Sequence, residues 1–211
     1  MSNKISFITR FHYLETSNEF LWRFDYYKNN VLPRILNQTN TDFDIWIWCE
    51  KKHDEMFKSL SNKINTFSAT YLKRDSKYFI DYTTWNEVKG LPKYNIQIGL
   101  DSDDLIEPTF VEKVKELSIG NKTIFISFQP MKLDIKNNKK YLMDKYTTKR
   151  GSPIFAFYQP DLTDFKFAYH TSHLLMPNIV DKVILIQEGY CYMSIHNLND
   201  STKIKPTDKR I

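Results

Sequence analysis

The sequence predicts an α/β domain with a mostly parallel central sheet, and three observations lead to this prediction. Strand-like and helix-like patterns alternate along residues 4–117, as they do where helical crossovers join parallel strands. Residues 43–49 are apolar on both faces after Asp44, which is typical of a strand covered on both sides. Of the 211 residues, 41% are hydrophobic, which is enough to build a full core in one domain over residues 1–211.

The elements of the first half follow one another at short intervals. Residues 4–11 alternate apolar and polar side chains and predict the first strand. Apolar residues then recur at helical spacing over residues 20–35, in a helix that Pro33 should break or kink. After the apolar strand described above, the pattern predicts a helix over residues 53–64 and a third strand over residues 66–72.

The second half changes character and is richer in strands. A fourth strand over residues 95–100 and a helix over residues 110–117 complete the alternating part. One further helix is expected between residues 161 and 174. Additional mixed strands are expected at residues 123–128, 140–143, 153–158, 183–187 and 190–195.

Three carboxylates, Asp101, Asp103 and Asp104, follow the fourth strand within four residues. Like charges this close raise one another's pKa unless a cation neutralises them, and carboxylate oxygens are ligands that hard divalent ions prefer. In open α/β sheets, ligands bind just outside the carboxyl ends of the strands, where this cluster should lie. The cluster therefore favours a metal-assisted reaction on a phosphorylated substrate.

The acidic cluster has three other possible interpretations. A solvated loop without an ion is one of them. An EF-hand fails because Leu105 and Ile106 stand at loop positions five and six, where a ligand and a glycine are needed. An Asp-x-Asp phosphatase motif would be expected near the N-terminus. The Asp-x-Asp of sugar-nucleotide enzymes, which holds an ion against a diphosphate, fits the position after the fourth strand.

Composition narrows the function classes further. The five glycines are isolated, so neither a dinucleotide-binding fingerprint nor a P-loop is present. The net charge of +5 suits an anionic substrate but is too diffuse to indicate nucleic acid. No apolar stretch approaches the roughly 18 residues of a membrane-spanning helix, and no secretory signal is visible, so we expect a cytoplasmic protein. Cys49 and Cys191 lie in apolar runs and are expected to be free and buried.

Several motifs in order resemble glycosyltransferases of the GT-A fold. The chain is most similar to the rhamnosyltransferase-like branch known from bacteria and large viruses, over about residues 4 to 117. The motifs are Thr9-Arg10-Phe11, Trp22-Arg23-Phe24, Leu32-Pro33-Arg34-Ile35-Leu36-Asn37-Gln38-Thr39, Phe43-Asp44-Ile45-Trp46 and Leu100-Asp101-Ser102-Asp103-Asp104. Such a domain divides into a nucleotide-sugar-binding half, residues 1–104, and an acceptor-binding half, residues 105–211.

The resemblance also implies roles for individual residues. The expected donor is a nucleoside diphosphate sugar, most readily a UDP-sugar. Residues expected to contact its base, ribose or phosphates are Thr9, Arg10, Glu50, Arg74, Asp101 and Ser102. Glu50 departs from the family, because many relatives have Asp where this chain has Cys49-Glu50. The resemblance implies a divalent ion, Mn²⁺ or Mg²⁺, held by Asp101, Asp103 and a late histidine, for which His196 is the candidate. Asp104 would bind the ion through water or cap the following helix.

The expected reaction is transfer of a hexose or deoxyhexose to a glycan or other acceptor. Inversion at the sugar is favoured because no obvious nucleophile pair is present. An inverting transferase needs a base for the acceptor hydroxyl, and His173 and Asp164 are the candidates. Two alternatives stay open: a nucleotidyltransferase that makes the sugar nucleotide, and a non-catalytic glycan-binding module stabilised by calcium.

Overall fold

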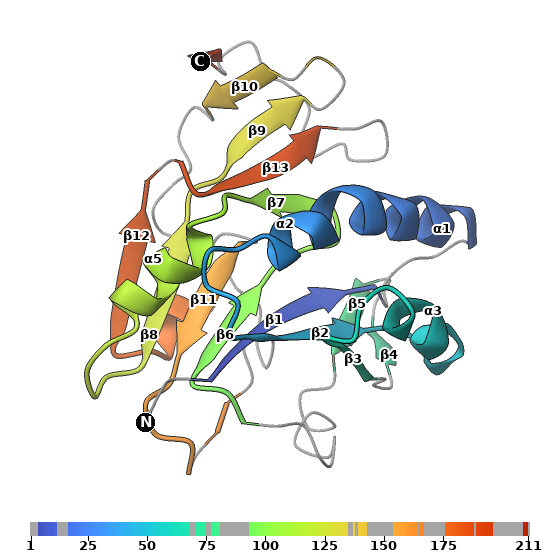
Figure 1. The fold of residues 1–211 in the computed structure, drawn as a ribbon. Helices are drawn as coiled ribbons and strands as arrows, with labels where there is room; N and C mark the ends of the chain where they lie inside the picture. Colours follow the sequence, from blue (N-terminus) through green and yellow to red (C-terminus); the bar gives the residue numbers. More distant parts are fainter. Residues whose placement is uncertain are drawn as a thin grey trace.

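The protein is a mixed α/β fold in which two larger sheets share one hydrophobic core (Figure 1). The computed structural model describes residues 4–11, 17–67, 71–74, 77–80, 93–134, 137, 139–142, 154–163, 165–166, 176–187, 189–195 and 209–210.

The central sheet is mostly parallel, which confirms the predicted fold class. β1 lies in its middle part, parallel to both β2 and β6, and within the sheet β11 alone runs antiparallel to both of its neighbours. Because β1, β2 and β6 are parallel, their carboxyl ends meet at one edge of the sheet. The strand order is β12 (Lys182–Ile186), β8 (Ile124–Phe128), β11 (Phe155–Tyr158), β6 (Ile96–Gly99), β1 (Ile5–Arg10), β2 (Asp44–Trp48) and β3 (Ile64–Phe67).

A second sheet lies above the first in Figure 1 and contains strands from the region after the acidic cluster. Its order is β14 (Lys209–Arg210), β10 (Lys139–Leu142), β9 (Met131–Asp134), β13 (Cys191–Ile195) and β7 (Asp104–Ile106). β4 (Tyr71–Arg74) and β5 (Lys77–Ile80) form a separate antiparallel pair, and a 3₁₀ turn spans Met176–Asn178.

A long helical segment runs from α1 (Ser17–Tyr26) through a π-helical turn (Tyr27–Val31) into α2 (Leu32–Leu36). The irregularity predicted at Pro33 therefore lies one turn earlier, where the Leu32 N–H donates to the Tyr27 carbonyl. Pro33 sits in the first turn of α2, where a missing N–H and a fixed φ are tolerated. The segment lies beside β7, so it links the start of the chain to the region after the acidic cluster (Figure 1).

Aromatic side chains attach the helices to the end of β1. Phe57 of α3 (Asp54–Lys58) is fully buried, and its ring centroid lies 4.7 Å from that of Phe11 and 5.2 Å from that of Phe24. Such tilted and edge-to-face pairs are worth about 0.5–1.5 kcal/mol each beyond their burial. The start of the helical segment is thereby held against the carboxyl end of β1.

Some predicted boundaries are wrong. The helix predicted over residues 53–64 ends at Lys58, after a 3₁₀ turn at Lys51–His53. Ile64, which was placed on that helix, begins β3 instead. The reason is local: the Ser61 hydroxyl accepts from the Lys63 N–H and the Ser61 carbonyl from the Ile64 N–H, a serine turn that competes with helix.

The strand predicted over residues 66–72 is also wrong, because its first residues end β3 and its last ones begin β4, which belongs to another sheet. Four short strands were missed: β5, β7, β9 and β14. Each has four residues or fewer, so its pattern is too short to predict a strand. β7 and β9 pair with β13 and β14 pairs with β10, all far along the chain, whereas β5 pairs with its neighbour β4. The helix predicted between residues 161 and 174 is not found in the described residues 161–163 and 165–166, and the rest of that stretch lies outside them. Helix α5 (Phe110–Leu117) is confirmed.

Candidate functional site

The three predicted carboxylates form a loop at the edge where the parallel strands end. We call residues Asp101 to Asp104 the acidic loop. It directly follows Leu100, whose N–H donates to the Ile8 carbonyl of β1 at 3.2 Å. The Asp104 N–H donates to the Asp101 carbonyl at 3.2 Å and closes the turn. The end of β1 therefore lies next to the loop, as predicted for a ligand site in this kind of sheet.

Arg10, the last residue of β1, pairs with the outer carboxylate of the loop. Its Nη2 atom lies 2.8 Å from Asp101 Oδ1. The two side chains are 24% and 23% exposed, so solvent reaches both partners. The two residues were predicted from different motifs, and the structure brings them together.

Arg23 pairs with the inner carboxylate of the loop. Its Nη1 atom lies 3.1 Å from Asp103 Oδ1 and donates to Ser102 Oγ, also at 3.1 Å. The Arg23 and Asp103 side chains are only 10% and 7% exposed. Arg23 Nε also lies 3.7 Å from Glu19 Oε1, one helical turn earlier. One guanidinium from α1 thus contacts two consecutive residues of the acidic loop.

Asp104 is the innermost carboxyl of the loop and starts β7. Its pKa is raised well above its usual range because burial disfavours the charged form, and the charges of Asp103 and Asp101 act in the same direction. It pairs with Met193 of β13, and its charge also raises the pKa of the buried Cys191 thiol, for which burial is the main cause. Asp104 does not cap α5, since that helix starts after Thr109.

Tyr26 connects the same face of α1 to β13. Its hydroxyl donates to Ser194 Oγ at 2.7 Å. Burial raises the Tyr26 pKa to about 12, the Ser194 hydrogen bond opposes the shift, and the charges of Asp103 and Asp104 add to it. The tyrosine therefore stays protonated and keeps this hydrogen bond at neutral pH.

The structure also explains why Gln38 and Thr39 belong to the motif that followed α1. Gln38 is buried, and its Nε2 donates to the Glu107 carbonyl at 2.8 Å while its Oε1 accepts from the Val111 N–H at 3.1 Å. The Thr39 N–H donates to the Pro108 carbonyl at 3.0 Å. The motif therefore fixes the chain between β7 and α5, just after the acidic loop.

Three further predicted binding residues are described, and three predicted catalytic or metal-binding residues are not. Thr9 is completely buried within β1, and its hydroxyl has no hydrogen-bond partner of good geometry in the part of the chain that is described. Glu50 is exposed after the end of β2 and lies 2.6 Å from Lys52 Nζ. Arg74 ends β4, and its backbone pairs with Lys77. His173, Asp164 and His196 lie outside the described residues.

The acidic loop has ligands suited to a divalent ion. Asp101 and Asp103 offer hard carboxylate oxygens at a partly exposed sheet edge, and Mg²⁺ in enzymes is commonly bound by one or two carboxylates together with substrate phosphates. Within the ranges described above, no group of three acidic, histidine or cysteine side chains gathers around one point. The loop thus offers two carboxylates to an ion whose coordination substrate phosphates would complete, and such an ion would compete with Arg10 for Asp101.

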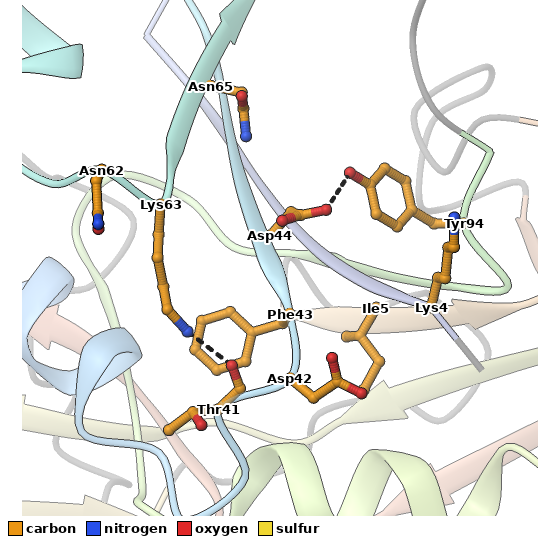
Figure 2. Close-up of a pocket in the computed structure, with 10 residues that line it drawn as sticks. All are labelled: Lys4, Ile5, Thr41, Asp42, Phe43, Asp44, Asn62, Lys63, Asn65 and Tyr94. Atoms are coloured by element: carbon orange, nitrogen blue, oxygen red, sulfur yellow. Dashed lines mark hydrogen bonds between the residues drawn. The ribbon is translucent and has the colours of Figure 1, made fainter. Parts of the chain in front are cut away.

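A polar groove lies at the opposite edge of the central sheet (Figure 2). It encloses about 640 Å³ and is lined by residues at the amino ends of β1, β2 and β3. Figure 2 shows the Tyr94 hydroxyl pointing to Asp44, with a 2.6 Å hydrogen bond, and Lys63 pointing to the Thr41 carbonyl. None of the predicted site residues lines this groove. Asp42 at its rim therefore serves as a control for charges remote from the acidic loop.

Sequence reasoning missed Arg23, Tyr26 and Gln38 as parts of this site. Arg23 and Gln38 stood inside motifs that carried the family resemblance, but no role was assigned to them. A usable signal was present for Arg23, which is a polar residue between the aromatic residues Trp22 and Phe24 of α1, because a buried polar side chain needs a partner. Gln38 follows the end of α2 in a polar stretch and gave no such signal. The partner itself lies 79 residues away for Arg23 and 73 for Gln38, a separation that the helix pattern cannot bridge.

Both cysteines are free and buried, as predicted, and none of the described helices is both long and apolar enough to cross a membrane.

Comparisons with known proteins agree with this architecture. The family model described as "Putative rhamnosyl transferase" matches residues 6–208. The search of curated proteins finds no match. Among solved structures, S. aureus TarS 1–349 in complex with UDP-GlcNAc has a TM-score of 0.59 and 10% identity, covering 96% of this chain and 62% of that chain.

Two further structures resemble the chain. S. aureus TarS has a TM-score of 0.53 and 9% identity, covering 91% of this chain and 37% of that one. The 4-diphosphocytidyl-2C-methyl-D-erythritol synthase from Anaerococcus prevotii has a TM-score of 0.50 and 14% identity, covering 94% and 92%. At such identities the likeness shows the fold alone, and it confirms the predicted GT-A type domain. The chain spans from 37% to 62% of the length of these TarS chains.

Proposed function

The chain belongs to the rhamnosyl transferase family, and on this premise we propose that it is a metal-dependent glycosyltransferase that uses a nucleoside diphosphate sugar. The transferred group is a hexose or deoxyhexose, with rhamnose suggested by the family, and the acceptor is a glycan or another hydroxyl compound. The observation that carries the proposal is the Arg10–Asp101 pair at the joined carboxyl ends of β1 and β6. It places a cation and a carboxylate, both partly exposed, where such sheets bind ligands.

The donor nucleotide is proposed to be a uridine diphosphate. The support is the fold likeness to TarS, whose structures were determined in complex with UDP and with UDP-GlcNAc. Base, ribose and phosphate contacts are proposed for Thr9, Arg10, Glu50, Arg74, Asp101 and Ser102. Arg10 is the best supported of them, because a guanidinium donates to phosphate oxygens in the same way as to the carboxylate that it contacts now.

The proposed reaction breaks the bond between the anomeric carbon and the diphosphate oxygen and forms a bond from the acceptor oxygen to that carbon. Asp101 and Asp103, with His196, would hold Mn²⁺ or Mg²⁺, which when bound supplies Lewis-acid stabilisation of the leaving diphosphate. Arg10 would donate to the same diphosphate and stabilise the charge that develops on it. His173 or Asp164 would take the acceptor proton, and a single base of this kind implies inversion.

One rival function has a specific observation in its favour. The likeness to the diphosphocytidyl-methylerythritol synthase covers nearly the whole of both chains, so a nucleotidyltransferase could share this fold. Such an enzyme would release pyrophosphate from a nucleoside triphosphate and a sugar phosphate. A pyrophosphate-release assay with each triphosphate therefore separates the two functions.

The first experiment is a calorimetric titration of nucleoside diphosphates and their sugars, with and without Mn²⁺. It uses the wild type, Asp101→Asn, Asp103→Asn and the control Asp42→Asn, which removes an exposed charge at the opposite sheet edge. We expect UDP and a UDP-sugar to bind only with Mn²⁺, and the Asp101 and Asp103 variants to lose at least about tenfold in affinity, or about 1.4 kcal/mol. The Asp42 variant should bind like the wild type.

Three outcomes would contradict the proposal. Absence of binding to every nucleotide in the wild type removes the transferase function. Metal-independent binding that Asp101→Asn leaves unchanged removes the role of the acidic loop. Release of pyrophosphate, without sugar transfer from any nucleotide sugar, would establish the rival function instead.

A further inference from the structure

The helix α1 presents three polar side chains on the face that meets the acidic loop and β13. Glu19, Arg23 and Tyr26 are spaced four and three residues apart, so they lie on one side of the helix. Arg23 contacts Ser102 and Asp103, and Tyr26 contacts Ser194 at the end of β13. This face therefore joins the acidic loop to the strand that leads toward position 196.

The contact of Arg23 with the acidic loop is built more tightly than an ordinary surface pair. Both side chains are nearly buried, and the same Nη1 atom reaches the Ser102 hydroxyl and the Asp103 carboxylate at 3.1 Å. Breaking a buried pair leaves an uncompensated charge, so the two partners hold one another strongly. Asp101, only two residues away, is 23% exposed and points to a different arginine.

The Arg23 charge reduces the repulsion among the carboxylates of the acidic loop. Three carboxylates in four residues repel one another, and that repulsion would spread the loop. Arg23 neutralises the middle carboxylate from inside and fixes Ser102 beside it, while Asp101 stays at the open edge. The loop can then present Asp101 outward without a bound ligand having to assemble it, which is the advantage of a preorganised site.

We propose that Arg23 is a positioning residue of the nucleotide-sugar site, and that it holds the acidic loop in its ligand-binding conformation through Ser102 and Asp103. The inference rests on the proposed function, since the ligand is the nucleoside diphosphate proposed there. It goes beyond that function because Arg23 itself would touch neither the nucleotide nor the reacting atoms. It would act through the two loop residues that it contacts, Ser102 and Asp103.

The test is the affinity of UDP with Mn²⁺, by calorimetry, for the wild type and for Arg23→Lys, Arg23→Gln and Arg23→Met. The control is Lys58→Met, which breaks the exposed helix pair with Glu55 far from the loop. Titrations are run at a temperature at which circular dichroism shows each variant fully folded, so that global instability cannot lower the affinity. Hydrogen exchange of the Asp101 to Asp104 amides is measured on the same samples without ligand.

We expect Arg23→Met and Arg23→Gln to bind UDP with Mn²⁺ at least about tenfold more weakly, with faster amide exchange in the loop. Arg23→Lys keeps the charge but loses the guanidinium fork that spans two partners, so its affinity should lie between those of the wild type and Arg23→Met. If Arg23→Met does not fold at any temperature, Arg23→Gln and Arg23→Lys decide the question. Lys58→Met should change neither affinity nor loop exchange.

Three results would overturn the inference, and they are distinguishable. Folded Arg23 variants that bind with wild-type affinity overturn the positioning role alone. A wild type that binds no nucleotide overturns the proposed function, and the inference falls with it. Weaker binding with unchanged loop exchange would also contradict the inference, because the effect would then not pass through the loop conformation.

Discussion

The two sides of the acidic loop differ in how their carboxylates are neutralised. On the outer side, Arg10 meets Asp101 with about a quarter of each side chain exposed. On the inner side, Arg23 meets Asp103 in a nearly buried pair that Ser102 completes, and Gln38 secures the backbone that follows. The inner groups are nearly buried, so water cannot solvate them if their partner is lost. The outer pair is partly solvated and can exchange its partner at little cost. We therefore distinguish a fixed inner frame, made by Arg23, Gln38, Ser102 and Asp103, from an exchangeable outer edge, made by Arg10 and Asp101.

The largest effect that would test this comparison is on the stability of the inner pair. Arg23→Met should lower the free energy of unfolding by about 3 kcal/mol, because it leaves Asp103 buried without its cation. Urea denaturation of the wild type, the single variant and the double variant Arg23→Met/Asp103→Leu measures this. The double variant should recover most of the loss. A single-variant loss below about 1 kcal/mol, the range of exposed pairs, would place the inner pair in the same class as the outer one.

The next prediction concerns Gln38, the uncharged residue of the inner frame. Gln38→Leu should cost about 2 kcal/mol, because the buried Val111 N–H and the Glu107 carbonyl each lose a partner. The control is Asn37→Leu, at the exposed neighbouring position, which should change stability by less than about 0.5 kcal/mol. Equal midpoints for the two variants in urea would show that the Gln38 hydrogen bonds are replaced by water.

The outer pair should behave in the opposite way. Arg10→Met should change the free energy of unfolding by less than about 1 kcal/mol, as partly exposed ion pairs do. The same variant should lower the affinity for UDP with Mn²⁺ by about tenfold, since one charge-assisted contact to the diphosphate is lost. Calorimetry and urea denaturation on one sample separate the two effects. Large destabilisation with unchanged affinity would reverse the roles assigned to the two arginines.

The smallest expected effect is the salt dependence of the two pairs. Raising the ionic strength from about 0.1 M to 1 M shortens the screening length from about 10 Å to 3 Å. The stability difference between the wild type and Arg10→Met should then shrink toward zero. The difference for Arg23→Met should stay nearly constant, because solvent ions do not reach a buried pair. Parallel salt dependence of both variants would contradict the division into an inner and an outer side.

Much of the fold was predictable because it depends on local patterns. The strands at β1, β2, β6 and β8 and helix α5 were predicted from apolar runs and helical spacing, which burial on one or both faces enforces. Boundaries failed where short polar contacts decide, as at the serine turn before β3. β7 was missed because the acidic segment gives no strand pattern, and its pairing with β13, far along the chain, creates the strand.

The candidate site was likewise predictable from sequence only in part. The acidic residues were identified from sequence because three carboxylates after a buried strand need a counter-charge, and Arg10 was identified through the family resemblance. Their pairing depends on which strands are neighbours, and the motifs do not contain that information. The sequence by itself determined the α/β class, the position of the acidic loop and its need for cations. Only the tertiary structure decided that α1 supplies Arg23 to Asp103 and β1 supplies Arg10 to Asp101, because each partner lies 80 or more residues away along the chain and the packing of helix against sheet brings them together.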